Sequence, residues 1–431
     1  MKARYYYNLL PAAFLLAGYA SAQAPFTSGS TGSDGALNFT TAGTYNFDPT
    51  TSACVPVISG CNTPPLDPSG DNIFNFTTIN IGTGVTLNLT NTLLRGKPVI
   101  WLASGAVTIA GVVNLNGTAG VNLATYGADW ITQRVPTQGG PGGFPGGVGA
   151  RPASPALPGL GPGGAPVQTN ASCGSGGAGS FATVGNSTPA GQTYGNTQLV
   201  PLIGGSGGSG GCVASTDTAT DASGGSGGGG GGAIRIESTT SIALTGQISA
   251  IGGSGGVGRS GGTPGGGGSG GAINLIAPSI TGGGQLYAYG GGSGGAGYVS
   301  LNAASNTYTG TDSAGGVTPT IRPLVAPPLP TFTSVPTVTI NSVNGVTVPQ
   351  PPTGAFQTPD VTINAATAVT INISAVGVPV GTVVLLNVQS ELGPDQNISC
   401  NPLAGTLASS TATCSASFPT SVSRILASAS W

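Results

Sequence analysis

The sequence predicts an all-β protein, in which a parallel β-helix-like solenoid with glycine-rich excursions is followed by a C-terminal immunoglobulin-like β-sandwich. A short unit recurs at Pro98–Gly117, Ala233–Gly252 and Ala272–Gly290, and glycine-rich sequence follows each copy. The last segment, 337–431, instead alternates apolar and polar residues, as the short strands of a sandwich do. Strong helix formers are scarce beside Thr, Val and Ile, so we expect almost no helix beyond the N-terminal leader.

The N-terminus predicts a secretory signal peptide over residues 1–22. Lys2 and Arg4 form its basic region, Leu9–Leu16 its apolar core and Ala20–Ala22 its cleavage site. The apolar core is too short for a permanent anchor, so we expect a secreted or cell-surface protein with no integral membrane span after cleavage. With 5% charged residues and a formal net charge of −2, the chain offers no basic patch that would attract nucleic acid.

Each copy of the repeat contains short apolar pairs whose members are two residues apart. This is the spacing of a strand, because successive side chains leave a strand on opposite faces. In the first copy the pairs are Val99/Trp101, Val107/Ile109 and Val113/Leu115. In the later copies they are Ile234/Ile236, Ile242/Leu244, Ile248/Ala250, Ile273/Leu275 and Leu286/Ala288, with Ile280 alone. Three short strands separated by Gly, Ser and Pro are typical of one coil of a parallel β-helix.

Composition divides the mature chain into three parts. Residues 23–318 are expected to form the solenoid. Residues 319–336 form a proline-rich linker, which marks a boundary because such segments are extended and semi-rigid. Residues 337–431 are expected to form the sandwich. The glycine-rich insertions of the solenoid lie at 118–232, 253–271 and 291–297.

The glycine-rich insertions allow two interpretations. Gly/Ser tracts usually behave as flexible linkers. Alternatively, because glycine has no Cβ, extended three-per-turn chains can pack backbone to backbone and share hydrogen bonds, as collagen chains do. The tracts recur at repeat boundaries and are nearly free of Lys and Glu, which favours the ordered arrangement.

Six cysteines fit an oxidising compartment. Proximity along the chain favours the pairs Cys54–Cys61, Cys173–Cys212 and Cys400–Cys414, although other pairings remain open. A metal site would need clustered ligands, and the chain has no C-x-x-C motif and no histidine. We therefore expect disulfides, no metal and no cofactor.

The tracts GGSGGSGG, GGGGGGAIRI and GGGGSGGAINL resemble those of two groups of glycine-rich bacterial secreted or surface proteins. One group comprises PE-PGRS-like proteins, from which this chain departs by having a leader in place of the Pro-Glu helical domain. The other comprises phage tail-fibre adhesins, whose glycine tracts pack as polyglycine helices. The resemblance covers Gly139–Gly297 and rests on composition. It implies surface display or adhesion, and it supplies no functional residues.

Catalysis that depends on histidine is excluded by composition. Carboxylates remain, and two of them suffice for glycoside hydrolysis. The repeats carry Arg235 and Glu237 at outward positions, which we interpret as a local surface pair. Two aspartate pairs are calcium candidates that we interpret as turn formers: Asp67/Asp71 and Asp217/Asp221.

Tyr287 and Tyr289 are the candidate ligand-binding residues. If Leu286 and Ala288 face inward, both tyrosines face outward together. Such a strip can stack on sugar rings, since tyrosine presents an apolar face and a polar hydroxyl. The alternative is that the two rings pack beneath a glycine excursion.

These observations predict a non-catalytic secreted or cell-surface protein with a structural or adhesive role. Its expected partner is an extracellular polysaccharide or another surface protein. A first alternative is a β-helix polysaccharide-degrading enzyme, a lyase or hydrolase that uses carboxylates. A second alternative is an ice-binding protein, suggested by Thr78, Asn80, Thr86 and Asn88, because a flat array of such side chains can order water.

Overall fold

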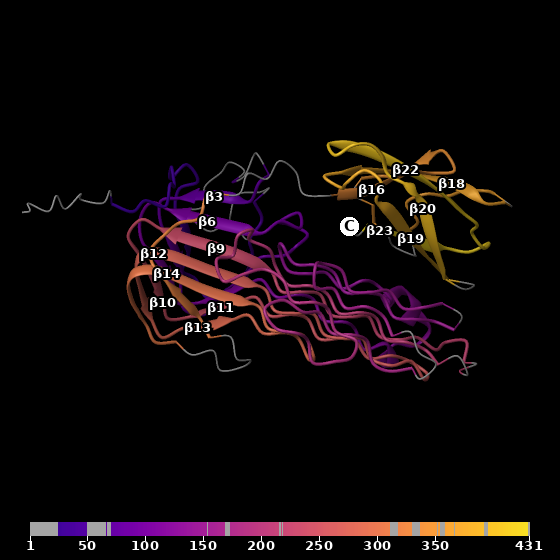
Figure 1. The fold of residues 1–431 in the computed structure, drawn as a ribbon, viewed down its shortest axis with the longest axis horizontal. Coiled ribbons are helices and arrows are strands. Elements are labelled where there is room, and N and C mark those ends of the chain that lie inside the picture. The colour runs from indigo at the N-terminus through magenta and orange to yellow at the C-terminus, as the bar shows by residue number, and fades with distance from the viewer. Residues whose placement is uncertain are drawn as a thin grey trace, which may run out of the picture.

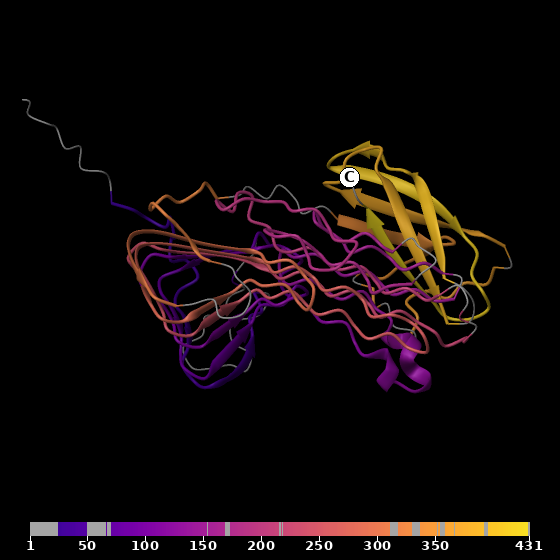
Figure 2. The same cartoon turned by 60° about the horizontal axis from the view of Figure 1, so that its bottom comes forward.

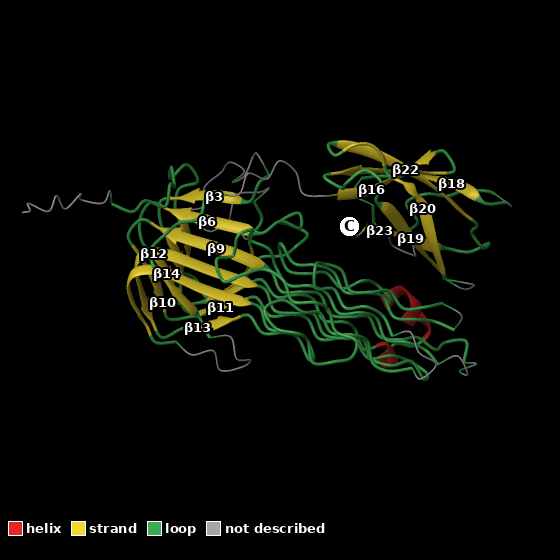
Figure 3. Cartoon of the chain, in the orientation of Figure 1, coloured by secondary structure: helices red, strands yellow, loops and turns green. Residues whose placement is uncertain are grey.

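The computed structural model describes residues 25–49, 66, 70–152, 154–168, 173–214, 217, 219–310, 318–329, 337–350, 352–353, 358–365, 367–391 and 395–429. The predicted signal peptide, the Cys54–Cys61 pair and Asp67 lie outside these residues. The described chain is almost entirely strand and loop, as expected, and its helical residues are confined to two short 3₁₀ helices, η1 (Leu123–Thr125) and η2 (Ala128–Gln133) (Figure 3).

Sheet A is a curved sheet of ten strands whose neighbours all run parallel (Figure 1). Its strands are β1 (Leu37–Phe39), β3 (Ile73–Phe76), β4 (Ile79–Ile81), β6 (Val99–Ala103), β7 (Val107–Ile109), β9 (Ala233–Ser238), β10 (Ser241–Leu244), β12 (Ala272–Gly282), β14 (Tyr298–Tyr308) and β15 (Thr320–Arg322). Eight follow the order β1-β4-β7-β10-β12-β9-β6-β3, and β14 pairs with both β12 and β15.

Sheet B has five parallel strands and shares its core with sheet A. Its strands are β2 (Gly43–Asn46), β5 (Val85–Asn88), β8 (Val112–Asn114), β11 (Gln247–Ser249) and β13 (Gln285–Tyr287), in the order β13-β11-β8-β5-β2. The apolar pairs of the repeats lie opposite one another across neighbouring strands: Val113 is opposite Ile248, which is opposite Leu286 on its other side. All three are buried in the common core.

The predicted fold class is wrong. A solenoid of separate coils, each with three tiny strands, would keep its rows of strands distinct. Instead β12 and β14 each run through 11 residues, and β12 pairs with β9 at one end and β10 at the other, so that two rows merge into one ten-stranded sheet. The period of the apolar residues identified the strands locally. It could not show that β12 continues through the break in the pattern at Pro278.

The glycine-rich insertions are likewise not excursions but an ordered bundle of extended segments beside the sheets (Figure 3). We call this the glycine bundle, and its segments are 116–122, 136–150, 155–168, 174–194, 204–212, 223–232, 250–258, 263–271 and 288–297. The amides of Gly205, Gly208 and Gly211 all donate to the one neighbouring segment 225–231, at 2.8, 2.9 and 2.8 Å. The intervening amides donate to other segments. This period of three is that of a polyproline II-type chain, whose backbone groups find partners only on its neighbours.

The C-terminal part consists of two antiparallel sheets around a second core. Its strands are β16 (Thr337–Val343), β17 (Val346–Thr347), β18 (Val369–Val376), β19 (Val383–Ser390), β20 (Gln396–Pro402), β21 (Ala404–Thr406), β22 (Ser409–Ala416) and β23 (Ser423–Ala429). The orders β17-β16-β18-β22-β21 and β20-β19-β23 replace the immunoglobulin-like assignment. Alternating residues correctly predicted strands such as β18 and β22, whereas alternation alone does not determine which strands pair.

Two of the predicted disulfides are confirmed. Cys173–Cys212 joins two segments of the glycine bundle, with Cα atoms 5.6 Å apart. Cys400–Cys414 joins β20 to β22 and so links the two C-terminal sheets. Both bonds are compatible with an oxidising, extracellular environment.

Beside the glycine bundle, three residues that flank its segments contact the C-terminal part (Figure 2). Arg134, which follows η2, forms an ion pair with Asp395, and the Nη2–Oδ2 distance is 2.8 Å. Arg151 lies 3.6 Å from the other oxygen of the same carboxylate, and Ser154 donates to the Asp395 carbonyl at 3.1 Å. Residues far apart in sequence therefore meet in one buried polar contact.

Candidate functional site

The outer face of sheet B carries mostly uncharged polar side chains, with an aromatic pair at one edge. Parallel register brings residues of successive strands into rows across a sheet. One row, in order from β2 to β13, is Asn46, Asn88, Asn114, Ser249 and Tyr287. The row beside it is Thr44, Thr86, Val112, Gln247 and Gln285.

The tyrosine pair lies at one edge of this face. Leu286 and Ala288 are buried in the core, and Tyr287 and Tyr289 are half-buried on the opposite side, which is the orientation that the sequence predicted. The two ring centroids are 5.6 Å apart and the rings are inclined at 67°, an edge-to-face arrangement. Their role as ligand-binding residues stays a prediction.

A ladder of asparagine side chains crosses the same face. Asn114 Nδ2 donates to Asn88 Oδ1 at 2.9 Å, and Asn88 Nδ2 donates to Asn46 Oδ1 at 3.5 Å. Asn116 Oδ1 accepts from the Ser249 hydroxyl at 2.7 Å. The amide groups are thus held in fixed orientations by one another, as a preorganised binding surface requires.

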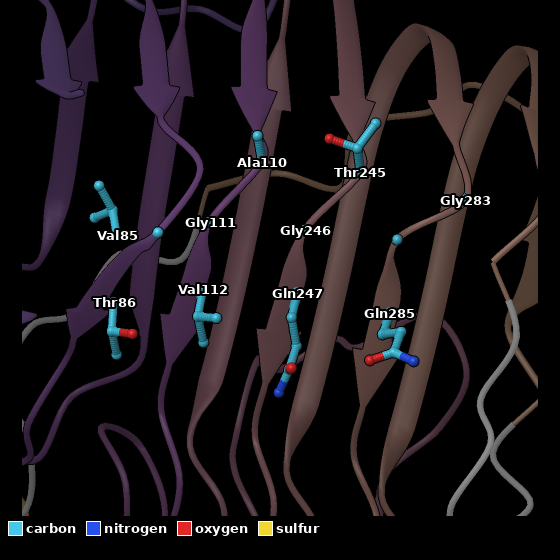
Figure 4. Close-up of a pocket in the computed structure, with 12 residues that line it drawn as sticks. Val85, Thr86, Ala110, Gly111, Val112, Thr245, Gly246, Gln247, Gly283 and Gln285 are labelled. Carbon is cyan, nitrogen blue, oxygen red and sulfur yellow. The ribbon is translucent and has the colours of Figure 1, made fainter. Parts of the chain in front are cut away.

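A groove with a volume of about 430 Å³ runs across the strands where sheet A turns into sheet B. Figure 4 shows Thr86, Val112, Gln247 and Gln285 on successive strands along one side and Ala110 and Thr245 on the other. Gly111 and Gly246 lie between the two sides. A Cβ on Gly246 would be 2.0 Å from the Gly111 carbonyl oxygen, so glycine alone lets these turns stack and leaves the groove open.

A second cavity, of about 300 Å³, lies where sheet B meets the glycine bundle. We call it the amide pocket; its lining residues are Asn88, Leu89, Thr90, Asn91, Thr92, Asn114, Asn116, Thr118, Gln138 and Gly139. Within the described chain, no charged side chain lines either this pocket or the groove. The surface therefore offers amides, hydroxyls and aromatic rings without formal charge.

Among the described residues, the carboxylates are spread over the structure and do not gather in one site. Asp221 pairs with Arg259 at 3.1 Å, and the described residues hold no group of three His, Cys, Asp or Glu side chains that would suit a metal ion. Asp71 and Asp217 each accept from the backbone amide two residues later, at 2.9 Å, which is the turn-forming geometry that we predicted.

Arg235 and Glu237 form an ion pair, but its predicted location at the surface is wrong. Both side chains are buried, and Arg235 donates hydrogen bonds to the carbonyls of the connector residues Pro327 and Pro328. An apolar cluster that includes Leu199 covers the same side of sheet A. Burial raises the Glu237 pKa from 4.5 to about 7, against the opposing effect of Arg235, and it lowers the Arg235 pKa.

This raised pKa predicts a contribution to stability that declines as the pH rises. The folded state binds the Glu237 proton more tightly than the unfolded state, so the contribution is complete below about pH 4.5 and is lost as the pH passes about 7. The expected loss in the free energy of unfolding is about 3 kcal/mol. Denaturant titrations between pH 4 and pH 8 should show this decline in the wild type and a flatter profile in Glu237→Gln.

Asp221→Asn provides the control, because it removes a carboxylate from an ion pair that is partly exposed. The free energy of unfolding of this variant should decline with rising pH as it does in the wild type. Identical slopes for the wild type and Glu237→Gln would contradict the assignment of this titration to Glu237.

The four residues that suggested an ice-binding array do not share one face. Asn80 lies on β4 of sheet A, whereas Thr86 and Asn88 lie on β5 of sheet B. Asn80 instead belongs to an outer row of sheet A with Asn38 and Thr108. The predicted array is therefore divided between two surfaces.

Sequence analysis missed Gln247, Gln285, Asn114 and Gln138 as residues of the candidate site. The first three occupy outward positions beside the apolar pairs of the repeats, so the alternation could have identified them. Gln138 comes from the glycine bundle, and no periodic signal places it beside sheet B.

The described residues contain no helix with the length and apolar character needed to span a membrane. Compared with protein-family models, curated proteins and solved structures, the chain matches none of them.

Proposed function

We propose that the protein is a non-catalytic secreted or cell-surface protein that binds carbohydrate through the outer face of sheet B. The observation that carries this proposal is the row across sheet B that contains both Tyr287 and Asn114, with the buried Ser249 between them. An aromatic platform beside fixed hydrogen-bonding groups suits a sugar, whose ring has an apolar face and a hydroxylated edge. The disulfides support an extracellular location.

Replacing Tyr287 and Tyr289 together by alanine is expected to weaken retention on a bound polysaccharide about tenfold, because both stacking surfaces are lost. The measurement is the dissociation constant of the purified, oxidised mature protein in affinity electrophoresis against a panel of polysaccharides. The same samples are assayed for reducing or unsaturated ends.

Tyr126→Ala is the matched control, since this half-buried tyrosine follows η1 and does not lie on sheet B. Its affinity should equal that of the wild type. Equal binding by the double variant would contradict the site, and release of new sugar ends would contradict the non-catalytic assignment.

A further inference from the structure

The amide pocket holds hydrogen-bonding capacity that the fold does not use. Asn91 Nδ2 donates to Gln138 Oε1 at 3.3 Å, whereas the buried Asn91 Oδ1 has no partner among the described residues. Asn116 uses its oxygen to accept from the Ile251 amide and the Ser249 hydroxyl. The Asn91 oxygen is closed off from the pocket, whereas the amide nitrogens of Asn116 and Gln138 donate to none of the described residues and can donate to a ligand oxygen.

The pocket is continuous with the tyrosine pair through the rows of sheet B. Tyr287 lies three strand spacings from Asn88, which is about 14 Å. Asn114 and Ser249 occupy the positions between them, and Asn114 also lines the pocket. One extended chain of linked sugar rings can therefore contact the aromatic edge and the amide pocket together.

The chemistry of the lining selects among glycans. A polymer of uronic acids carries a carboxylate on each ring, and recognition of carboxylates relies on Arg or Lys. The pocket and the groove have no charged lining residue in the described chain, so they offer no compensation for burying such a charge. Amide and hydroxyl groups instead match the hydroxyls of an uncharged sugar.

We propose that the amide pocket is a second subsite of the sheet B face and that the ligand is a neutral polysaccharide whose chain crosses the strands from Tyr287 to Gln138. This inference rests on the proposed function. Asn116 and Gln138 donate to sugar oxygens, and Asn91 orients Gln138 through its hydrogen bond to Oε1. The tyrosine pair stacks on a ring at the other end of the chain.

The test measures dissociation constants for neutral polysaccharides (cellulose, xylan, mannan and starch) and for the uronates pectate and alginate, each at low and high salt. Neutral chains are expected to bind with little dependence on salt, because no ion pair is screened. Asn91→Ala and Gln138→Ala should each weaken binding about fivefold. Asn38→Ala, which removes an exposed amide from the outer face of sheet A, should leave the affinity unchanged.

The outcomes separate this inference from the function on which it rests. If the tyrosine variants lose binding while Asn91→Ala and Gln138→Ala keep it, carbohydrate binding stands and the second subsite is overturned. If pectate or alginate binds and the neutral chains do not, the ligand class is overturned. If none of these polysaccharides binds, both proposals fail. Near-ultraviolet circular dichroism of each variant establishes that it is folded.

Discussion

Gly228→Ala is expected to destabilise the protein by at least about 3 kcal/mol, or to prevent folding of the glycine bundle. An added Cβ would lie 1.8 Å from the Gly253 carbonyl oxygen and 2.5 Å from its carbon. Both backbones are held in place: the Gly228 amide donates to Gly266 and its carbonyl accepts from Gly208, while the Gly253 amide donates to Gly229 and its carbonyl accepts from Gly268. Denaturant unfolding followed by circular dichroism measures the loss.

The same substitution would have the opposite sign in a flexible linker. There, alanine restricts the unfolded chain as much as the folded one or more, so stability would be unchanged or slightly higher. The experiment thus tests the packing of the bundle itself. If Gly228→Ala unfolds at the same denaturant concentration as the wild type, backbone-to-backbone packing at this position is contradicted.

Gly283→Ala is the matched control. Gly283 is exposed, and its added Cβ would meet only the Thr309 hydroxyl oxygen at 3.5 Å, which is ordinary contact. Its free energy of unfolding should stay within about 0.5 kcal/mol of the wild type. The pair of variants separates a clash from a general effect of replacing glycine.

The sequence allowed prediction of those features that local periodicity determines. The apolar pairs at Ile234/Ile236 and Leu286/Ala288 identify strands and their inward faces, and the outward position of Tyr287 follows from the second pair. Periodicity does not determine which strands join into one sheet, since the continuation of β12 depends on pairing with both β9 and β10. The prediction of a solenoid is wrong for this reason.

Glycine tracts pose a different difficulty. These segments are mostly glycine and carry little side-chain pattern that specifies a neighbour, and most of the hydrogen bonds between them join backbone groups. The sequence could therefore favour an ordered bundle but could not place Gln138 beside Asn91. The hydrogen bonds of the buried Arg235 depend in the same way on Pro327 and Pro328, which lie far along the chain.

Asp395→Ala is expected to destabilise the contact between the glycine bundle and the C-terminal sheets by about 3–5 kcal/mol, because it leaves buried guanidinium charge without its partner. Arg134 and Asp395 both have side chains that are 2% exposed. Burial lowers the Arg134 pKa despite the opposing effect of Asp395, which indicates how strongly this charge depends on the carboxylate. Arg151 would also lose its contact with the carboxylate.

The expected signature is separation of one unfolding transition into two, since the two cores share this contact while each retains its own apolar residues. Scanning calorimetry and limited proteolysis of the connector measure it. Asp360→Ala is the control, because this carboxylate lies in the same part of the chain and contacts Thr353 instead. An unchanged single transition for Asp395→Ala would contradict the role of the ion pair.

A double variant tests whether the destabilisation by Asp395→Ala arises from the unpaired charge of Arg134 or from the lost contact. In Arg134→Met/Asp395→Leu the two principal charges are removed together and apolar side chains of similar size replace them. Since a buried ion pair recovers little more than its desolvation cost, this variant should be more stable than Asp395→Ala. Greater destabilisation in the double variant would mean that the hydrogen bond from Arg134 to the Gly149 carbonyl, 2.6 Å long, contributes more than the ion pair.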